Sequence, residues 1–378
     1  MKLCVLKENP AVETRVAATP ETVKKFVQLG FTVAVVKGAG EGAAIADDDF
    51  RGAGAAIAGD AAEAMRDADV VLAVRAPEGD FAGCKKGALL IGLLAPHAGA
   101  DIVERCAAAG LTAMAMEFMP RISRAQYMDV LSSQANLAGY KAVVDAVAFF
   151  RRAVPMMMTA AGTIAPARVF VMGAGVAGLQ AVATARRLGA IVSATDVRAA
   201  AAEQVQSLGA AFIMVEQDGA DAETAAGYAR EMGEDYKCAQ AQLIAGHIRN
   251  QDIVVCTALI PGRPAPVLVS EEMVKSMRPG SVLVDLAVEQ GGNCPLSRPG
   301  EIVTAHGVAI MGHANVPGRL AVDASAMLAK NLYNFVATLV DAGQGELSVD
   351  YDDELVRGVA LTRDGRIIHP QLLEARDD

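Results

Sequence analysis

Short apolar runs alternate with segments of helical periodicity along almost the whole chain. This alternation predicts strand–helix–strand units, and the near-continuous apolar runs are typical of parallel strands buried on both faces. In the first third, the predicted strands span residues 2–6, 32–36, 70–74, 88–92 and 111–115, and the predicted helices span 20–29, 61–66 and 100–109. We therefore expect an α/β protein.

A second series of the same kind follows in the middle of the chain. Its predicted strands and helices span residues 168–172, 191–195, 211–215, 252–257, 281–286 and 308–311, and 178–188 and 199–208, respectively. Long helical stretches at 129–152 and 323–340 flank this series, which indicates one domain inserted into another. We therefore predict a discontinuous domain of residues 1–134 plus 319–378 and an inserted domain of residues 135–318.

The composition excludes several classes of protein. The 378 residues are 53% hydrophobic, which provides enough core for two or three domains and rules out a disordered chain. The net charge of −10, without a basic patch, excludes a nucleic-acid partner. No apolar stretch is long enough for a membrane span, and Glu8 comes too early for a signal peptide. Six scattered cysteines lack metal-ligand spacing and fit reduced thiols, so we expect a cytoplasmic protein without a metal site.

One glycine-rich motif has the context of a dinucleotide-binding turn. The predicted strand 168–172 leads directly into the sequence GAGVAG, and a helical pattern follows. In such a turn, Gly173 would allow the tight bend, Gly175 would let the backbone approach a pyrophosphate, and Gly178 would let helix and strand pack closely. The helix N-terminus would present N–H groups and positive partial charge to the phosphates.

An acidic residue follows at the expected distance. The next predicted strand ends at Asp196, 18 residues beyond Gly178. Its carboxylate would accept hydrogen bonds from the adenosine ribose hydroxyls and would repel a 2′-phosphate. The pattern therefore predicts NAD(H) rather than NADP(H) as the cofactor, although Arg198 nearby weakens that preference.

Residues 117–140 form a polar stretch at the predicted junction between the domains. Its polar side chains are Arg121, Arg124, Gln126, Asp129, Ser132, Ser133, Gln134 and Asn136. Together they offer the donors and acceptors that a nicotinamide carboxamide needs. On the residues alone, a nucleotide site and a network of helix caps and inter-domain hydrogen bonds are equally good interpretations.

The acidic, glycine-containing stretch between Val215 and Lys237 does not fit the packed pattern. A stretch of about 20 residues with little core-forming material is long for a loop. On the residues alone, a solvated helical excursion and a mobile flap over a site are both open.

Several long motifs resemble a known family. They are RISRAQYMDVLSSQANLAGY (121–140), PMMMTAAGTIAPARV (155–169), GAGVAGLQA (173–181), ATDVRA (194–199), GYAREMG (227–233), TALIPGRPAPVL (257–268) and DLAVEQGGNCP (285–295). They resemble the NAD(H)-binding component of proton-translocating nicotinamide nucleotide transhydrogenase, over essentially the whole chain. The resemblance implies two Rossmann-like, doubly wound parallel-sheet domains joined by long helices, with the cofactor in the cleft and usually a homodimer.

The resemblance also implies roles for individual residues. Arg121, Gln126 and Asp129, the implied catalytic set, match contacts to the nicotinamide and its ribose, as does Ser132. The nucleotide-contacting set further includes Gly173, Gly175, Val176, Ala177, Gly178, Asp196, Val197, Arg198, Ala258 and Leu259. Tyr228 and Met232 match a mobile loop that closes on bound nucleotide, which favours the flap interpretation.

Alanine dehydrogenase shares this two-domain plan and is the alternative. Arg15 resembles that enzyme's substrate arginine, but Ala73 stands at the matching lysine position. The matching catalytic histidine is missing near 93–95, and His97 is out of register. Hydride passage between two nicotinamide rings needs no general acid, so the missing groups favour transhydrogenase. A non-enzymatic NAD-sensing protein is a third possibility, which the polar set at 121–132 disfavours.

The resemblance finally implies partners and a location. Only one glycine turn is present, so NADP(H) is expected on a separate NADP(H)-binding component, and the proton path on a membrane-spanning component. The activity would then be Si/Re-specific hydride transfer from NADH to NADP⁺. The polar end after His369 is expected to belong to a naturally split subunit rather than to an excised piece. Such a subunit would be peripheral, on the cytoplasmic face of the inner membrane, through its partner subunits.

Overall fold

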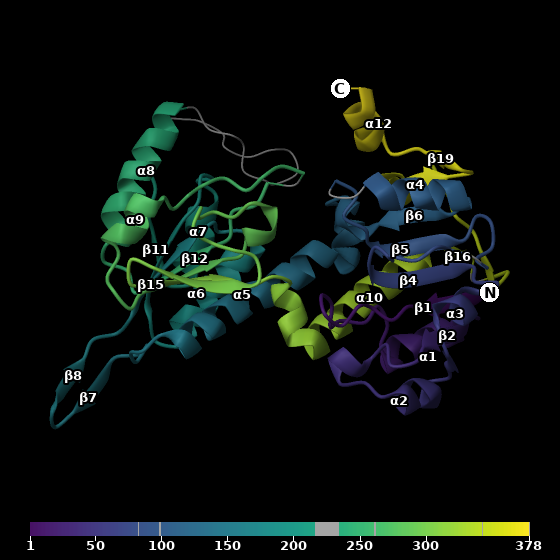
Figure 1. Ribbon diagram of the computed structural model, residues 1–378, viewed down its shortest axis with the longest axis horizontal. Coiled ribbons are helices and arrows are strands. Elements are labelled where there is room, and N and C mark those ends of the chain that lie inside the picture. The colour runs from purple at the N-terminus through teal and green to yellow at the C-terminus, as the bar shows by residue number, and fades with distance from the viewer. Residues whose placement is uncertain (82, 98–99, 216–233, 261, 342, 378) are drawn as a thin grey trace. The chain divides into compact units, whose positions relative to one another are not determined.

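The computed structural model describes residues 1–378 apart from 82, 98–99, 216–233, 261, 342 and 378. The chain divides into two compact units (Figure 1). Unit 1 consists of Met1–Gln134 and Gly318–Asp378, and unit 2 consists of Ala135–Pro317. Each unit has its own central sheet.

The sheet of unit 1 is parallel throughout. Its six strands lie in the order β3-β2-β1-β4-β5-β6, and they are β1 (Lys2–Val5), β2 (Thr32–Val36), β3 (Ala56–Ala58), β4 (Val70–Arg75), β5 (Leu89–Leu93) and β6 (Thr112–Ala115). This order, in which the chain turns back from β1 to build the other half of the sheet, is the doubly wound arrangement. The sequence prediction omitted β3, which has only three residues.

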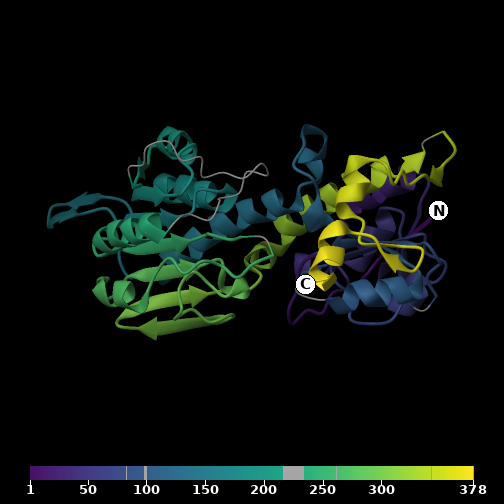
Figure 2. The ribbon, with the colours of Figure 1, turned by 90° about the horizontal axis from the view of Figure 1, so that it is seen from above.

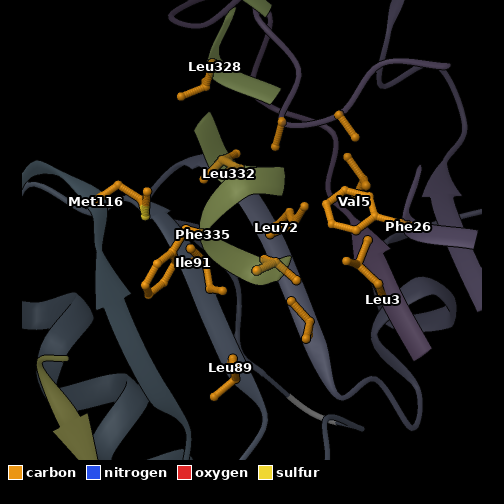
Figure 3. Packing of buried hydrophobic residues seen from close by; sticks show 14 of the residues in the cluster. Leu3, Val5, Phe26, Leu72, Leu89, Ile91, Met116, Leu328, Leu332 and Phe335 are labelled. Carbon is orange, nitrogen blue, oxygen red and sulfur yellow. The ribbon is translucent and has the colours of Figure 1, made fainter. Parts of the chain in front are cut away.

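Helices from both chain segments cover this sheet. They are α1 (Pro20–Gln28), α2 (Asp47–Gly52), α3 (Ala61–Met65), α4 (Ala100–Ala109), α10 (Ala321–Thr338), α11 (Glu354–Val359) and α12 (Pro370–Asp377). Figure 3 shows α10 against the strands, with Leu328, Leu332 and Phe335 directed at Leu72 and Ile91. The spacing of these three residues puts them on one face of the helix, and all are fully buried. The second chain segment is therefore part of the core of unit 1.

The sheet of unit 2 has seven strands in the order β11-β10-β9-β12-β13-β15-β14. They are β9 (Arg168–Met172), β10 (Ile191–Thr195), β11 (Ala211–Phe212), β12 (Ile253–Cys256), β13 (Val282–Asp285), β14 (Glu301–Ala305) and β15 (Val308–Gly312). All neighbours pair in parallel except β14 and β15. The predicted α/β class with two doubly wound parallel sheets is confirmed.

The antiparallel strand β14 was not predicted, and its turn explains it. Ala305 pairs with Val308, so only His306 and Gly307 connect the two strands. Both turn residues have positive φ, 52° and 78°. Two such residues form the tight turn that matches the twist of an antiparallel hairpin. β14 therefore extends the parallel sheet by one edge strand.

The helices of unit 2 are α5 (Val130–Phe149), which begins in the last residues of unit 1, α6 (Val176–Arg187), α7 (Ala201–Ser207), α8 (Glu234–Ile248) and α9 (Glu271–Ser276). Buried apolar residues lie on both faces of the sheet, and Val169 and Val171 face the opposite side from Phe170 and Met172. A small hairpin of β7 (Met157–Thr159) and β8 (Gly162–Ile164) extends away from the rest of unit 2 (Figures 1 and 2).

Short elements complete the chain. They are the 3₁₀ turns Glu41–Ala43, Met116–Phe118, Ser123–Met128, Val288–Gln290 and Val316–Leu320, and the paired strands β16 (Val340–Asp341) with β17 (Glu346–Leu347) and β18 (Thr362–Arg363) with β19 (Arg366–Ile367). None of the helices among the described residues has both the length and the apolar character needed to cross a bilayer.

Candidate functional site

The glycine turn lies between β9 and α6 in unit 2. Gly173 has a φ of +102°, a conformation that residues with a Cβ rarely adopt. Its N–H donates to the carbonyl oxygen of Thr195 at 2.9 Å, and its carbonyl oxygen accepts from Oγ1 of Thr257 at 2.9 Å. A Cβ at Gly173 would lie 2.6 Å from that same Oγ1. The fold itself therefore requires glycine at this position.

Close packing also requires glycine on the two helices beside the turn. A Cβ at Gly178 would stand 1.8 Å from the carbonyl oxygen of Gly173, which brings α6 directly onto the turn. A Cβ at Gly139 on α5 would stand 2.0 Å from the carbonyl oxygen of Ala177. The first turn of α6 is thus fixed from two sides.

Gly175 differs from these positions. Its φ of −77° and ψ of −167° describe extended backbone that any residue can adopt. A Cβ there would have no atom within 4 Å. The packing of the protein therefore does not account for this glycine. It stands at the N-cap of the 12-residue helix α6, where N–H groups and the helix dipole favour an anion. The absent side chain and the positive helix end fit a pyrophosphate.

Neighbouring strands bring further predicted residues to the same edge of the sheet. β10, β9 and β12 lie side by side, and Thr195, Met172 and Cys256 pair at their carboxyl ends. Asp196, Gly173 and Ala258 follow these strands directly or by one residue. The two sides of β9 connect in opposite directions, so this edge is the switch point of the sheet, where ligands of doubly wound folds bind.

Asp196 is almost fully buried, and its carboxylate accepts hydrogen bonds from this chain itself. Its Oδ2 accepts from the N–H of Ala174 at 2.7 Å, and its Oδ1 accepts from the N–H of Arg198 at 2.9 Å. The guanidinium of Arg198 adds Nε to Oδ1 and Nη2 to Oδ2, both at 2.9 Å. Burial acts to raise the pKa of Asp196, but the hydrogen bonds from Arg198 and Ala174 outweigh it and lower the pKa. Asp196 is therefore a carboxylate at neutral pH, and it is already paired.

An asparagine that the sequence prediction did not assign orders the loop after β12. Asn293 is fully buried, accepts from the N–H of Ala258 at 3.1 Å, and donates to the carbonyl oxygens of Ala258 and Pro266 at 2.9 and 2.7 Å. This side chain closes both ends of the loop, whose Leu259 is exposed. Its place in the motif GGNCP was the available signal, because a buried amide needs partners of this kind.

The polar stretch belongs mostly to unit 1, and there its side chains divide into two groups. Asp129 caps α5, since its Oδ1 accepts from the N–H of Ser132 at 2.8 Å and its Oδ2 from the hydroxyl of Ser132 at 2.6 Å. Arg124 forms a two-bond ion pair with Asp353. Arg121 and Gln126, by contrast, are exposed. The capping interpretation therefore holds for part of the stretch.

The remaining polar residues of the stretch have partners in the fold. Ser133 donates to Oδ1 of Asn331 at 2.7 Å, and Gln134 accepts from Arg15 at 2.8 Å. In unit 2, Asn136 donates weakly to Gln180 at 3.4 Å. Of the predicted loop residues, Tyr228 and Met232 lie outside the described residues, as does the predicted flap at 216–233.

The residues that resemble alanine dehydrogenase do not present a substrate site. Arg15 is buried, and its Nε and Nη2 donate to both oxygens of Glu13 at 2.8 and 2.7 Å. Ala73 is also buried, and His97 is exposed with its ring 5.0 Å from that of Phe118. The guanidinium that would bind a substrate carboxylate is therefore engaged inside unit 1. Among the described residues, no cluster of histidine, cysteine or acidic side chains forms a metal site.

A glycine turn at the switch point of a doubly wound parallel sheet defines an α/β protein of the Rossmann type. Family models for alanine dehydrogenase/PNT match this chain twice, the N-terminal domain over residues 4–138 and the C-terminal domain over residues 142–370. The chain therefore belongs to the alanine dehydrogenase/PNT family.

Individual relatives refine this placement. The chain is 56% identical to the first of the separately encoded pieces of NAD(P) transhydrogenase subunit alpha of Rhodospirillum rubrum, over 98% of this chain and 99% of that one. The structure of a transhydrogenase from Sinorhizobium meliloti aligns with a TM-score of 0.88 at 52% identity, covering 97% of this chain and all of that one. An L-alanine dehydrogenase structure aligns with a TM-score of 0.83 at 27% identity, covering 100% and 99%. The predicted resemblance to transhydrogenase is confirmed.

Proposed function

We propose that this chain is the NAD(H)-binding subunit of a proton-translocating transhydrogenase. In this proposal it presents NADH to NADP⁺ held on a separate component, with Si/Re-specific hydride transfer. The observation that carries the proposal is Gly175, because the fold does not require a glycine there and a bound pyrophosphate does. The 56% identity to a transhydrogenase subunit supports the same assignment.

The residues of unit 2 would bind the adenosine half of the nucleotide. The turn from Gly173 to Gly178, with the first-turn N–H groups of Val176 and Ala177, would hold the pyrophosphate. Asp196 with Val197 and Arg198 would meet the adenosine ribose, and Ala258 and Leu259 would line the same edge of the sheet. When bound, NADH supplies the hydride from its nicotinamide ring. The chain contributes binding and orientation, which need no acid or base.

The polar residues of unit 1 would serve the nicotinamide half. Arg121, Gln126, Asp129 and Ser132 form the proposed set, and Tyr228 and Met232 are added on the family resemblance alone. The exposed side chains of Arg121 and Gln126 support this role, since neither is buried in the fold. The bond from the Ser132 hydroxyl to Asp129 would fix the orientation of that hydroxyl toward a ligand.

The alternative is an alanine dehydrogenase-like amino-acid dehydrogenase, which the similar overall fold favours. That reaction needs a free cation for the substrate carboxylate and a proton donor and acceptor. The burial of Arg15 against Glu13 counts against it.

We further propose the assembly that such a subunit needs. The NADP(H)-binding component and the membrane-spanning component are separate partners, and docking on them holds this chain at the cytoplasmic face of the inner membrane. A homodimer is part of the proposal. The exposed hairpin of β7 and β8 supports it, because Met156, Met157, Met158 and Ile164 are 60%, 47%, 76% and 43% exposed. Apolar surface of this kind marks protein contacts.

Isothermal titration calorimetry with NADH and with NADPH tests the proposal. We expect one NADH per chain and much weaker binding of NADPH. A parallel assay with pyruvate, ammonium and NADH is expected to show no turnover. Equal affinity for both nucleotides would contradict the assignment to NAD(H), and steady oxidation of NADH with pyruvate and ammonium would favour the alternative.

A further inference from the structure

The carboxylate of Asp196 has its acceptor positions used by the chain. Two oxygens offer about four lone-pair positions for hydrogen bonds. Asp196 accepts four bonds, from the N–H groups of Ala174 and Arg198 and from two nitrogens of the Arg198 guanidinium, all at 2.7–2.9 Å. An adenosine ribose that donates its hydroxyls to Asp196 must therefore displace a donor that is already in place.

The four bonds differ in how easily they can be released. The two backbone N–H groups belong to the glycine turn and to the residue after the strand end, so moving them distorts the main chain. The two guanidinium bonds form a parallel, two-bond pair and are released by rotation of one side chain. The guanidinium is therefore the donor that a ribose would exchange with.

We infer that the Arg198 side chain is an internal competitor for the ribose-binding positions of Asp196 and thereby determines both the affinity and the selectivity for NAD(H). This inference rests on the proposed function, since it concerns the same nucleotide. While it is paired, Arg198 also neutralises the charge with which Asp196 repels a 2′-phosphate. The competitor therefore weakens NADH binding and moderates the exclusion of NADPH.

The test compares Arg198→Met with the wild-type chain. Methionine keeps an unbranched side chain but has no donor and no charge. Adenosine 5′-monophosphate isolates the adenosine end, and adenosine 2′,5′-bisphosphate adds the 2′-phosphate. Calorimetry with these probes and NADH is expected to show about tenfold tighter binding of the monophosphate and NADH, the scale of one released ion pair. The bisphosphate is expected to bind more weakly than to wild type.

Two further variants separate competition from other effects. Arg187→Met removes an exposed arginine from the last turn of α6 and serves as the charge-matched control, with all three affinities unchanged. In the double variant Asp196→Asn/Arg198→Met, the tightening is expected to disappear, because the competition acts only through Asp196. Thermal melts of each variant report whether the fold is kept.

The outcomes distinguish the inference from the proposed function. If Arg198→Met weakens NADH and the monophosphate while the wild type binds both, Arg198 is a direct ligand contact and the inference is overturned. Tightening that persists without Asp196 also overturns it. If the wild-type chain binds neither NADH nor the monophosphate, the proposed function fails, independently of Arg198.

Discussion

The glycine turn of unit 2 and the polar stretch of unit 1 both have sequences that fit a nucleotide, but the fold uses them differently. In the turn, Gly173 and Gly178 are needed by the protein's own packing, whereas Gly175 faces open space. In the polar stretch, Arg124 and Asp129 serve internal bonds, whereas Gln126 is exposed. A residue without a task in the fold is therefore the stronger evidence for a ligand.

The largest effect is expected from Gly178→Ala. The added Cβ would stand 1.8 Å from the carbonyl oxygen of Gly173, so α6 must move away from the turn. We expect a loss of about 3 kcal/mol or more in unfolding free energy, at the upper end of overpacking effects, and loss of NADH binding. Denaturant unfolding measures the first and calorimetry the second. Gly246→Ala on α8, where a Cβ meets nothing within 4 Å, is the matched control. Equal stability of the two variants would refute the packing role of Gly178.

Gly175→Ala separates ligand from fold most cleanly. Its backbone suits alanine and no atom is close, so the unfolding free energy is expected to change by less than about 1 kcal/mol. The Cβ would come between the backbone and a pyrophosphate, and NADH is expected to bind at least about tenfold more weakly. Unchanged NADH affinity would show that this glycine has no ligand, which would remove the main support for the turn as the site.

Asp129→Ala tests whether the polar stretch does more than cap a helix. Removing the cap of α5 is expected to cost about 1 kcal/mol, because the N–H of Ser132 loses its acceptor. Asp129→Ser provides a replacement cap and is expected to recover most of the stability without recovering NADH affinity. If the serine variant binds NADH as the wild type does, Asp129 is a cap alone.

The smallest effect is expected from Arg124→Gln. Its ion pair with Asp353 lies on the surface of unit 1, where solvent screens it. Both the melting temperature and the NADH affinity are expected to stay close to wild type, as measured by thermal unfolding and calorimetry. A clear loss of NADH affinity would move Arg124 from the internal group of the polar stretch to the ligand group.

Much of the fold could be predicted from the sequence, because buried parallel strands leave unmistakable apolar runs. The strand at 168–172, the glycines after it and the following helix formed one consistent pattern, and all three elements are present. The strand β14 was missed, since its alternating residues at an exposed edge form no apolar run and its turn is only two residues long. Short runs at an edge leave too little signal.

For the candidate site, residue types and spacing could be read from the sequence, but side-chain direction could not. Asp196 and Arg198 are two residues apart, which predicted proximity and left open whether the arginine would face a phosphate or the carboxylate. The same limit applies to Asn293, whose three bonds to the loop after β12 join residues about 30 positions apart. Contacts of this kind follow from the tertiary fold and not from a local pattern.

Single-turnover hydride transfer tests the central claim most directly. The chain is mixed with the NADP(H)-binding component of a related transhydrogenase, NADH and an NADP⁺ analogue whose reduction is visible, and the absorbance is followed by stopped flow. We predict rapid reduction of the analogue that needs both proteins and is lost with Gly175→Ala. No transfer above that of the NADP(H)-binding component alone, although the wild-type chain binds NADH, would contradict the account.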